Sequence, residues 1–167
     1  MGGLIKMKKK LIIIGLVIII ITGGIIFKNG YFGNIDSNEY LSSIEEDNRS
    51  IGYNGTHKSN KNGDSFEFKE FNGKWSLMKI SSSKGNEIII KDSTKISKGK
   101  FYIVVLDSNH NIIAKKNELK DNGDIKFTTA NDGEYYIRIV GLNASGNFNV
   151  SINAKNNIKV SHKNFFD

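Results

Sequence analysis

The most suggestive spacing for chemistry belongs to the oxygen-bearing side chains that begin at Asp107. In the run Asp107-Ser108-Asn109-His110-Asn111 they alternate, and Glu118 falls at the twelfth position, where an EF-hand calcium loop places a bidentate carboxylate. The sixth position, where that loop needs glycine, is Ile112, which also begins a strand-like apolar run. A turn between two strands is therefore the favoured interpretation. Calcium binding by Asp107, Asn109, Asn111 and Glu118 stays the alternative.

Three aromatic residues are candidates for stacking against a sugar ring. Trp75, Tyr102 and Tyr136 would form such a platform if they shared one exposed face, because aromatic rings offer a large contact area at low entropic cost. Residues of this kind more often belong to a core. The register around Trp75 is open, since Trp75 with Leu77, or Met78 with Ile80, could point inward.

Nothing in the sequence resembles a catalytic centre. The three histidines, His57, His110 and His162, are far apart in the chain and outside any zinc motif, so we expect them to be exposed to solvent. Cysteine is absent, the serines lack a G-x-S-x-G elbow, and no glycine-rich loop precedes a helix. We expect no enzymatic activity and no cofactor, with calcium as the one open alternative.

The N-terminal segment predicts a membrane helix. Residues 11–27 read LIIIGLVIIIITGGIIF, carry no charge, and as a helix would span roughly 25 Å, about one hydrocarbon core. Four lysines precede this stretch within residues 1–10 and only Lys28 follows it closely, which places the N-terminus in the cytoplasm and the rest outside. An uncleaved anchor is the favoured interpretation. Cleavage near Gly24, with secretion, is the alternative, and Met7 is a second candidate start.

The basic charge belongs mainly to this membrane flank. The formal net charge is +7, from 24 basic and 17 acidic residues. Five lysines precede Asp36, the first acidic residue, so the remainder holds 19 basic and 17 acidic residues, a balance of +2. A nearly neutral domain does not suggest a nucleic-acid partner.

Residues 28–64 are rich in Asn, Gly, Ser and charge, and predict a spacer with one short helix near 37–46. Asp36 with Glu39 fits a capping box, and Tyr40, Leu41 and Ile44 would share one face of that helix.

From residue 65 to 153 the apolar period becomes two, and turn signals recur every 8 to 12 residues. This rhythm predicts an all-β, antiparallel, jelly-roll-like sandwich of about eight strands. The expected strands are Phe66–Phe71, Lys74–Ser82, Asn86–Lys91, Lys100–Asp107, Asn111–Lys115, Asp124–Thr128, Gly133–Val140 and Gly146–Asn153.

The alternation also predicts which side chains face inward. We expect Tyr135, Ile137, Phe148 and Val150 to share one core, and Asn149 to face solvent. Residues 101–106 are apolar on both faces, so part of the sheet needs a cover on its outer side. Candidate covers are the 37–46 helix, the tail at 154–167 and another molecule. Within the tail, we predict that residues 157–161 dock on this surface or pair with a sheet edge, using Ile158 and Val160.

The C-terminal half resembles a known family. The segments GKFYIVVLD at 99–107, DGEYYIRI at 132–139 and GNFNV at 146–150 are similar to the end of bacterial pre-peptidase C-terminal (PPC) domains. The similarity covers about residues 65–153 and implies a jelly-roll-like sandwich that assists, binds or spaces without catalysing. The whole chain also resembles surface proteins of clostridia-like bacteria with one membrane anchor and one such domain. We therefore expect a non-catalytic binding or spacer module that contacts a cell-surface protein or cell-wall glycan. A carbohydrate-binding or calcium-dependent adhesion module is the alternative.

Overall fold

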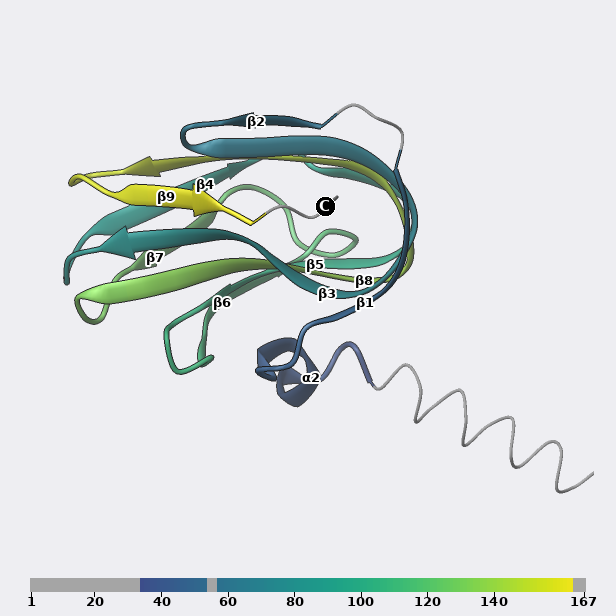
Figure 1. Cartoon of the computed structure of the whole chain (residues 1–167), viewed down its shortest axis with the longest axis horizontal. Coiled ribbons are helices and arrows are strands. Elements are labelled where there is room, and N and C mark those ends of the chain that lie inside the picture. The colour runs from purple at the N-terminus through teal and green to yellow at the C-terminus, as the bar shows by residue number, and fades with distance from the viewer. Residues whose placement is uncertain (1–33, 54–56, 164–167) are drawn as a thin grey trace, which may run out of the picture. The chain divides into compact units, whose positions relative to one another are not determined.

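The computed structural model describes residues 34–53 and 57–163, and the described chain is mostly antiparallel β-sheet (Figure 1). The predicted all-β class is confirmed. The elements are α2 (Asn38–Ser42), β1 (Asp47–Tyr53), β2 (Lys58–Asn60), β3 (Gly63–Ser82), β4 (Glu87–Asp92), β5 (Lys95–Leu106), β6 (Ile112–Asn117), β7 (Ile125–Thr128), β8 (Gly133–Ala154) and β9 (Lys159–His162).

The predictions for the N-terminal segment concern residues that are not described. The basic segment at 1–10, the membrane helix at 11–27, the start at Met7 and the cleavage position near Gly24 lie outside the described residues. In the part of the chain that is described, no helix is long and apolar enough to cross a membrane.

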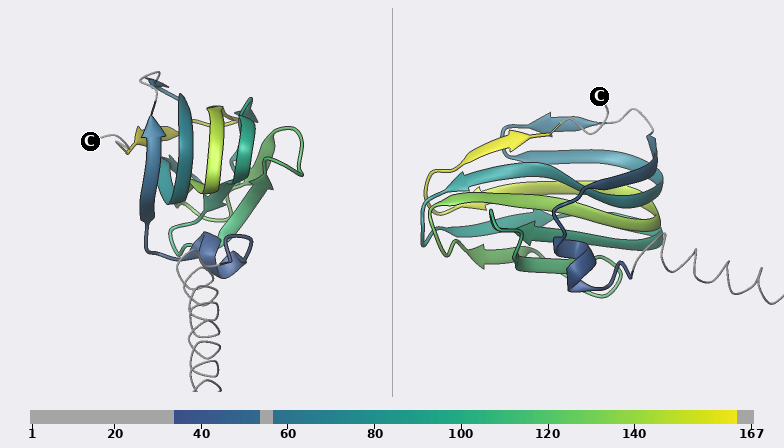
Figure 2. Two further views of the ribbon diagram at one scale, coloured as in Figure 1. Left: turned by 90° about the vertical axis from the view of Figure 1, so that its right-hand side faces the viewer. Right: turned by 60° about the horizontal axis from the view of Figure 1, so that its bottom comes forward.

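Two long strands, β3 and β8, build both layers of the fold. They pair along most of their length, from Gly63 opposite Ser151 to Ser82 opposite Gly133, and Figure 1 shows both of them bending over at the same side. The halves at 63–71 of β3 and 144–154 of β8 lie in one layer with β2, β4 and β7. The halves at 74–82 and 133–142 lie in the other layer with β9, β6 and residues 100–106 of β5. Residues 95–98 of β5 pair with β8 in the first layer. Figure 2 shows the two layers from the bent side and from below.

Three of the boundaries between the expected strands are bends inside longer strands. Asn72-Gly73, Lys98-Gly99 and Ser145-Gly146 lie within β3, β5 and β8, and pairing shifts register beside them instead of ending. At Gly99 the backbone has φ +79°, and a Cβ there would lie 2.2 Å from the carbonyl oxygen of Asn143. These glycines permit close approach of backbones where the strands pass from one layer to the other. The strand boundaries expected at these positions are therefore wrong.

The core between the layers contains the side chains that alternation placed there. Tyr135, Ile137, Phe148 and Val150 are all buried in one cluster, and Asn149 is exposed, as predicted. Trp75 packs against this cluster, which settles its register. Leu77 and Met78 are both buried because the pairing with β8 shifts between Ser76 and Met78, so one residue of β3 is extra.

The α2 segment covers the outer face of β5 and β8. This helix is one of the three covers expected from the sequence. Ile35 and Leu41 form a second buried cluster with Tyr102, Val104, Leu106 and Val140. The cap differs from the prediction, because Ser37 accepts the Tyr40 amide at 3.2 Å while Asp36 binds Tyr102 and Lys100. The helix ends at Ser42, so Ile44 does not continue its apolar face and is 75% exposed.

Both flanks of the expected domain join the sheet. The tail pairs with an edge of the sheet, as predicted, with Val160 opposite Ile80 in β3, and Ile158 and Val160 pack against the core. The stretch 28–64 is expected to be a spacer, but β1 and β2 within it pair with β3. A polar composition does not exclude pairing with the sheet, because an edge strand can be held by backbone hydrogen bonds alone. The compact unit therefore begins at Ile35.

Candidate functional site

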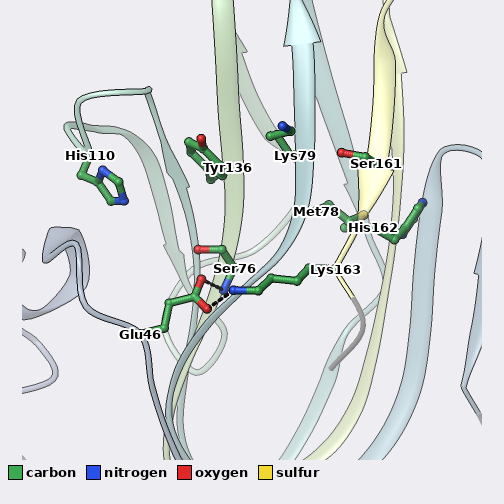
Figure 3. A pocket seen from close by; sticks show the side chains of 9 residues that line it. All are labelled: Glu46, Ser76, Met78, Lys79, His110, Tyr136, Ser161, His162 and Lys163. Carbon is green, nitrogen blue, oxygen red and sulfur yellow. Dashed lines mark hydrogen bonds and ion pairs between the residues drawn. The ribbon is translucent and has the colours of Figure 1, made fainter. Parts of the chain in front are cut away.

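A pocket among the described residues lies where β9, β3 and β8 run side by side (Figure 3). Its volume is about 360 Å³, which is in the range of small-ligand sites. The segment before β1 and the loop between β5 and β6 complete it. The lining residues are Glu46, Ser76, Met78, Lys79, His110, Tyr136, Ser161, His162 and Lys163.

One wall of the pocket is aromatic. The rings of His110 and Tyr136 are stacked, with centroids 5.8 Å apart and planes at 18°. The Tyr136 hydroxyl donates to Glu134 at 3.1 Å, and Glu134 forms an ion pair with Lys79 at 2.7 Å. Burial, together with the nearby Glu134 carboxylate, raises the pKa of Tyr136 above its usual value. Tyr136 is therefore a neutral hydroxyl at physiological pH, held in place by an ion pair.

The other wall is ionic. Glu46 accepts the backbone amide of Ser76 at 3.1 Å and forms an ion pair with Lys163, whose ammonium lies 4.2 Å from the centre of the Trp75 ring. Burial opposes ionisation of Glu46, yet the bonds from Lys163 and Ser76 hold its pKa below the usual value. Glu46 thus occupies the part of the β3 edge that lies between the residues paired with β1 and the residues paired with β9.

Arg138 supports the pocket floor from below. Its side chain is fully buried, and it donates to Ser76 Oγ at 3.2 Å and to the carbonyl oxygens of Leu41 and Ser43 at 3.1 and 2.7 Å. Burial lowers the pKa of Arg138, while the charge of Glu46 opposes that shift. The guanidinium therefore fixes Ser76 in the pocket and the end of α2 on the sheet.

The three candidate stacking residues do not share a face. Tyr136 lines the pocket, whereas Trp75 packs toward the core between the layers. Tyr102 is buried under α2, where its hydroxyl donates to Asp36 at 2.6 Å and accepts from Asn117 at 2.9 Å. Burial and the Asp36 carboxylate raise the pKa of Tyr102 to about 12. Tyr102 is a structural anchor, so only Tyr136 remains available to a ligand in the pocket.

The candidate calcium ligands are divided between two places. Asp107 closes a turn, because its Oδ1 accepts the amides of Asn109 and Asn111 and its Oδ2 accepts the Asn111 side chain. Glu118 lies at the far end of the β5–β6 hairpin, where its amide donates to the carbonyl of Phe101. Leu106 lies five positions beyond Phe101 in β5, roughly 17 Å along a strand. One ion cannot contact both Asp107 and Glu118 in this arrangement.

Glu118 belongs instead to a buried ionic group. Lys116 forms ion pairs with Asp92 and Glu118, and the two carboxylate side chains are 0% and 3% exposed. Burial, then the hydrogen bond with Asp92 and its charge, raises the pKa of Glu118 to about 8. Burial also opposes ionisation of Asp92, but the Lys116 ammonium and the Thr94 amide hold its pKa below the usual value. Nothing in the sequence indicates that the ends of β4 and β6 meet.

Two of the histidines are not the exposed residues that the sequence suggests. His57 and His162 both lie beside Asp64, at 2.7 and 3.8 Å, and are about three-quarters buried. One signal was present, since Asp64 continues the alternation of Phe66 and Phe68 and so had to point inward. Across residues 34–53 and 57–163, no three His, Cys, Asp or Glu side chains form a ready metal centre.

No protein-family model matches this sequence, and no curated protein is significantly similar to it. The resemblance to pre-peptidase C-terminal domains therefore stays a prediction.

Proposed function

We propose that the chain is a non-catalytic binding or spacer module displayed outside a bacterial cell membrane. The uncharged stretch at 11–27, with four lysines before it, supports a membrane anchor that leaves the sheet domain outside the cytoplasm. The proposal includes a jelly-roll-like sandwich of the pre-peptidase C-terminal type, for which the two packed β layers are favourable. Secretion after cleavage near Gly24 is the alternative location.

The pocket beside Tyr136 is the observation that carries a binding role. It combines an aromatic ring, hydroxyl groups and two ion pairs, a mixture that suits a polar ligand with one apolar face. Such ligands include short peptides of a surface protein and sugars of the cell wall. A glycan ligand is the second candidate, because Tyr136 offers both a ring and a hydroxyl. In that alternative, Asp107, Asn109 and Asn111, which lie together in one turn, would be the remaining candidate calcium ligands.

The orientation has a direct test in intact protoplasts. With a tag at the C-terminus, added protease should remove the tag, because the domain is expected outside the membrane. With a tag ahead of Lys6, the tag should survive until the membrane is broken. The opposite pattern would exclude the proposed topology, and a C-terminal tag found in the medium would favour cleavage.

The binding role is tested on cell-wall fragments and a glycan array with the full-length protein in detergent. We expect Tyr136→Ala to weaken binding at least about tenfold, since it removes the ring that forms one wall of the pocket. Lys126→Ala, at an exposed position on β7 in the other layer, is the matched control and should bind like the wild type.

Each outcome of that experiment supports a different function for the domain. Loss of binding in EDTA and in Asp107→Ala would favour calcium-dependent adhesion. Equal binding by Tyr136→Ala and the wild type would remove the pocket from the proposal. Absence of binding to both kinds of probe would leave a spacer.

A further inference from the structure

A group of three polar side chains lies in the gap between the two layers, outside the pocket's aromatic and ionic walls. His57 precedes β2, Asp64 is near the start of β3, and His162 is the last residue of β9. Asp64 points between the layers because it alternates with the buried Phe66 and Phe68. His162 comes from the opposite layer, where it lies across from the buried Met78. The group therefore joins three segments that are distant in the sequence.

Asp64 is at the centre of the group. Its side chain is 3% exposed, and its Oδ1 lies 2.7 Å from His57 Nε2, a strong hydrogen bond. The T-shaped contact between His57 and Phe66, at 6.1 Å and 76°, fixes the imidazole in that direction. The second carboxylate oxygen, Oδ2, faces His162 Nδ1 at 3.8 Å. That distance is too long for a hydrogen bond.

His162 is the unexplained member. Both of its ring nitrogens are buried and have no hydrogen-bond partner among the described residues. A buried polar atom without a partner has lost its hydrogen bonds to water and gained none in return, so native proteins rarely leave one in place. About a fifth of the side chain is exposed through ring atoms other than the two buried nitrogens, so His162 lies at the margin of the core.

We infer that Asp64 Oδ2 and His162 Nδ1 bind a divalent transition-metal ion of the zinc type. Zinc binds imidazole nitrogen and carboxylate oxygen at about 2.0 to 2.2 Å, so two ligands of a tetrahedral ion lie about 3.3 to 3.6 Å apart. The 3.8 Å gap between these two atoms is slightly wider, and a small rotation of the partly exposed His162 ring would close it around the ion. Water molecules complete the coordination, and no third protein ligand is required.

His57 has a different role in this site. Its bond to Asp64 Oδ1 orients the carboxylate from outside, as hydrogen bonds to ligating carboxylates do in metal sites. The nearby Lys163 ammonium does not oppose the ion's charge directly, because it is engaged by Glu46 and by the Trp75 ring. With two protein ligands the affinity should be modest, in the micromolar range.

A bound ion would link the C-terminal strand to the opposite layer. β9 forms four residue pairs with the second half of β3. The ion would connect β9 across the core to Asp64, which lies in the first half of β3. Since an ion that binds only the folded state stabilises it, zinc should raise the melting temperature. His162 also lines the pocket beside Tyr136, but the inference does not rest on the ligand proposed for that pocket.

The test is titration of the full-length protein in detergent with ZnCl₂, by calorimetry and by the fluorescence of the single tryptophan, Trp75, during melting. We expect one saturable site and a melting temperature that rises by several degrees. His162→Gln should raise the dissociation constant at least about tenfold and abolish the thermal shift, since it removes the nitrogen ligand. His57→Gln should weaken binding by about tenfold while leaving the site saturable.

The third histidine provides the matched control. His110→Gln removes an imidazole that stacks on Tyr136 and lies away from Asp64, so the zinc affinity should not change. Ca²⁺ should not compete, because it prefers oxygen ligands. Circular dichroism establishes that each variant is folded, and His162→Gln is preferred over Asp64→Asn because His162 is partly exposed. Equal zinc affinity in His162→Gln and the wild type, or no saturation below about 1 mM, would overturn the site.

Discussion

Truncation of Phe148 to alanine should destabilise the domain by roughly 3 to 5 kcal/mol, the usual cost of removing a large aromatic side chain from a core. Phe148 is fully buried near the middle of the second half of β8. Its ring lies 5.1 Å from that of Phe66 and 6.3 Å from that of Phe101, which come from β3 and β5. The cavity would therefore open where three strands contribute aromatic side chains, and bent strands cannot close it without losing pairing.

The measurement is chemical denaturation followed by Trp75 fluorescence. A loss of this size could unfold the domain, since small domains have only about 5 to 15 kcal/mol of stability. Phe148→Leu, which leaves a smaller cavity, should then show an intermediate loss. Asn149→Ala is the control, because that side chain is exposed and its strand contacts use the backbone. An unchanged midpoint for Phe148→Ala would contradict the assignment of this ring to the core.

Much of the sheet was accessible from the sequence, because period-two alternation reports which face of a strand is buried. It placed Tyr135, Ile137, Phe148 and Val150 correctly, and the two-sided apolar run at 101–106 correctly required a cover. Alternation does not report whether a strand ends. Glycine after a polar residue suits a chain reversal and also suits a bend. The breaks expected between strands at Asn72-Gly73 and Ser145-Gly146 are therefore bends within β3 and β8.

The candidate sites were harder to predict because they depend on contacts between distant segments. Asp64 could be assigned an inward direction, but its two histidines come from positions 57 and 162. Tyr136 was a candidate stacking residue in the sequence, yet its pocket depends on Glu46 and on the path of β9. Residue type and spacing describe one strand at a time, and the pairing of strands decides which side chains meet.

The buried group of Asp92, Lys116 and Glu118 makes the stability of the domain depend on pH. With both carboxylates ionised, Glu118 Oε1 is buried without a donor among the described residues. A proton on Glu118 removes this defect, because the carboxyl can then donate to Asp92. The pKa of Glu118 is accordingly raised from 4.5 to about 8 in the folded protein. Lys116 cannot compensate fully, since its single charge is shared between two carboxylates.

The direction of the effect follows from proton linkage. Between pH 4.5 and about 8 the folded state retains a proton on Glu118 that the unfolded state has lost, so stability falls as pH rises through this window. Below pH 4.5 the contribution is fully present, and above about 8 it is gone. A shift of this size corresponds to a change on the order of a few kcal/mol. The lowered pKa of Asp92 acts in the opposite direction, and only at more acidic pH.

Glu118→Gln isolates this contribution. Glutamine keeps the shape and can donate to Asp92 at every pH, so the variant should be more stable than the wild type at pH 9, and its stability should vary less from pH 5 to 9. Glu87→Gln, at an exposed carboxyl on β4, is the matched control and should retain the wild-type dependence. The free energy of unfolding is measured by denaturant titration at several pH values in this range. A Glu118→Gln variant with the full wild-type slope would show that another group carries the pH dependence, and the proton would then have to be assigned elsewhere.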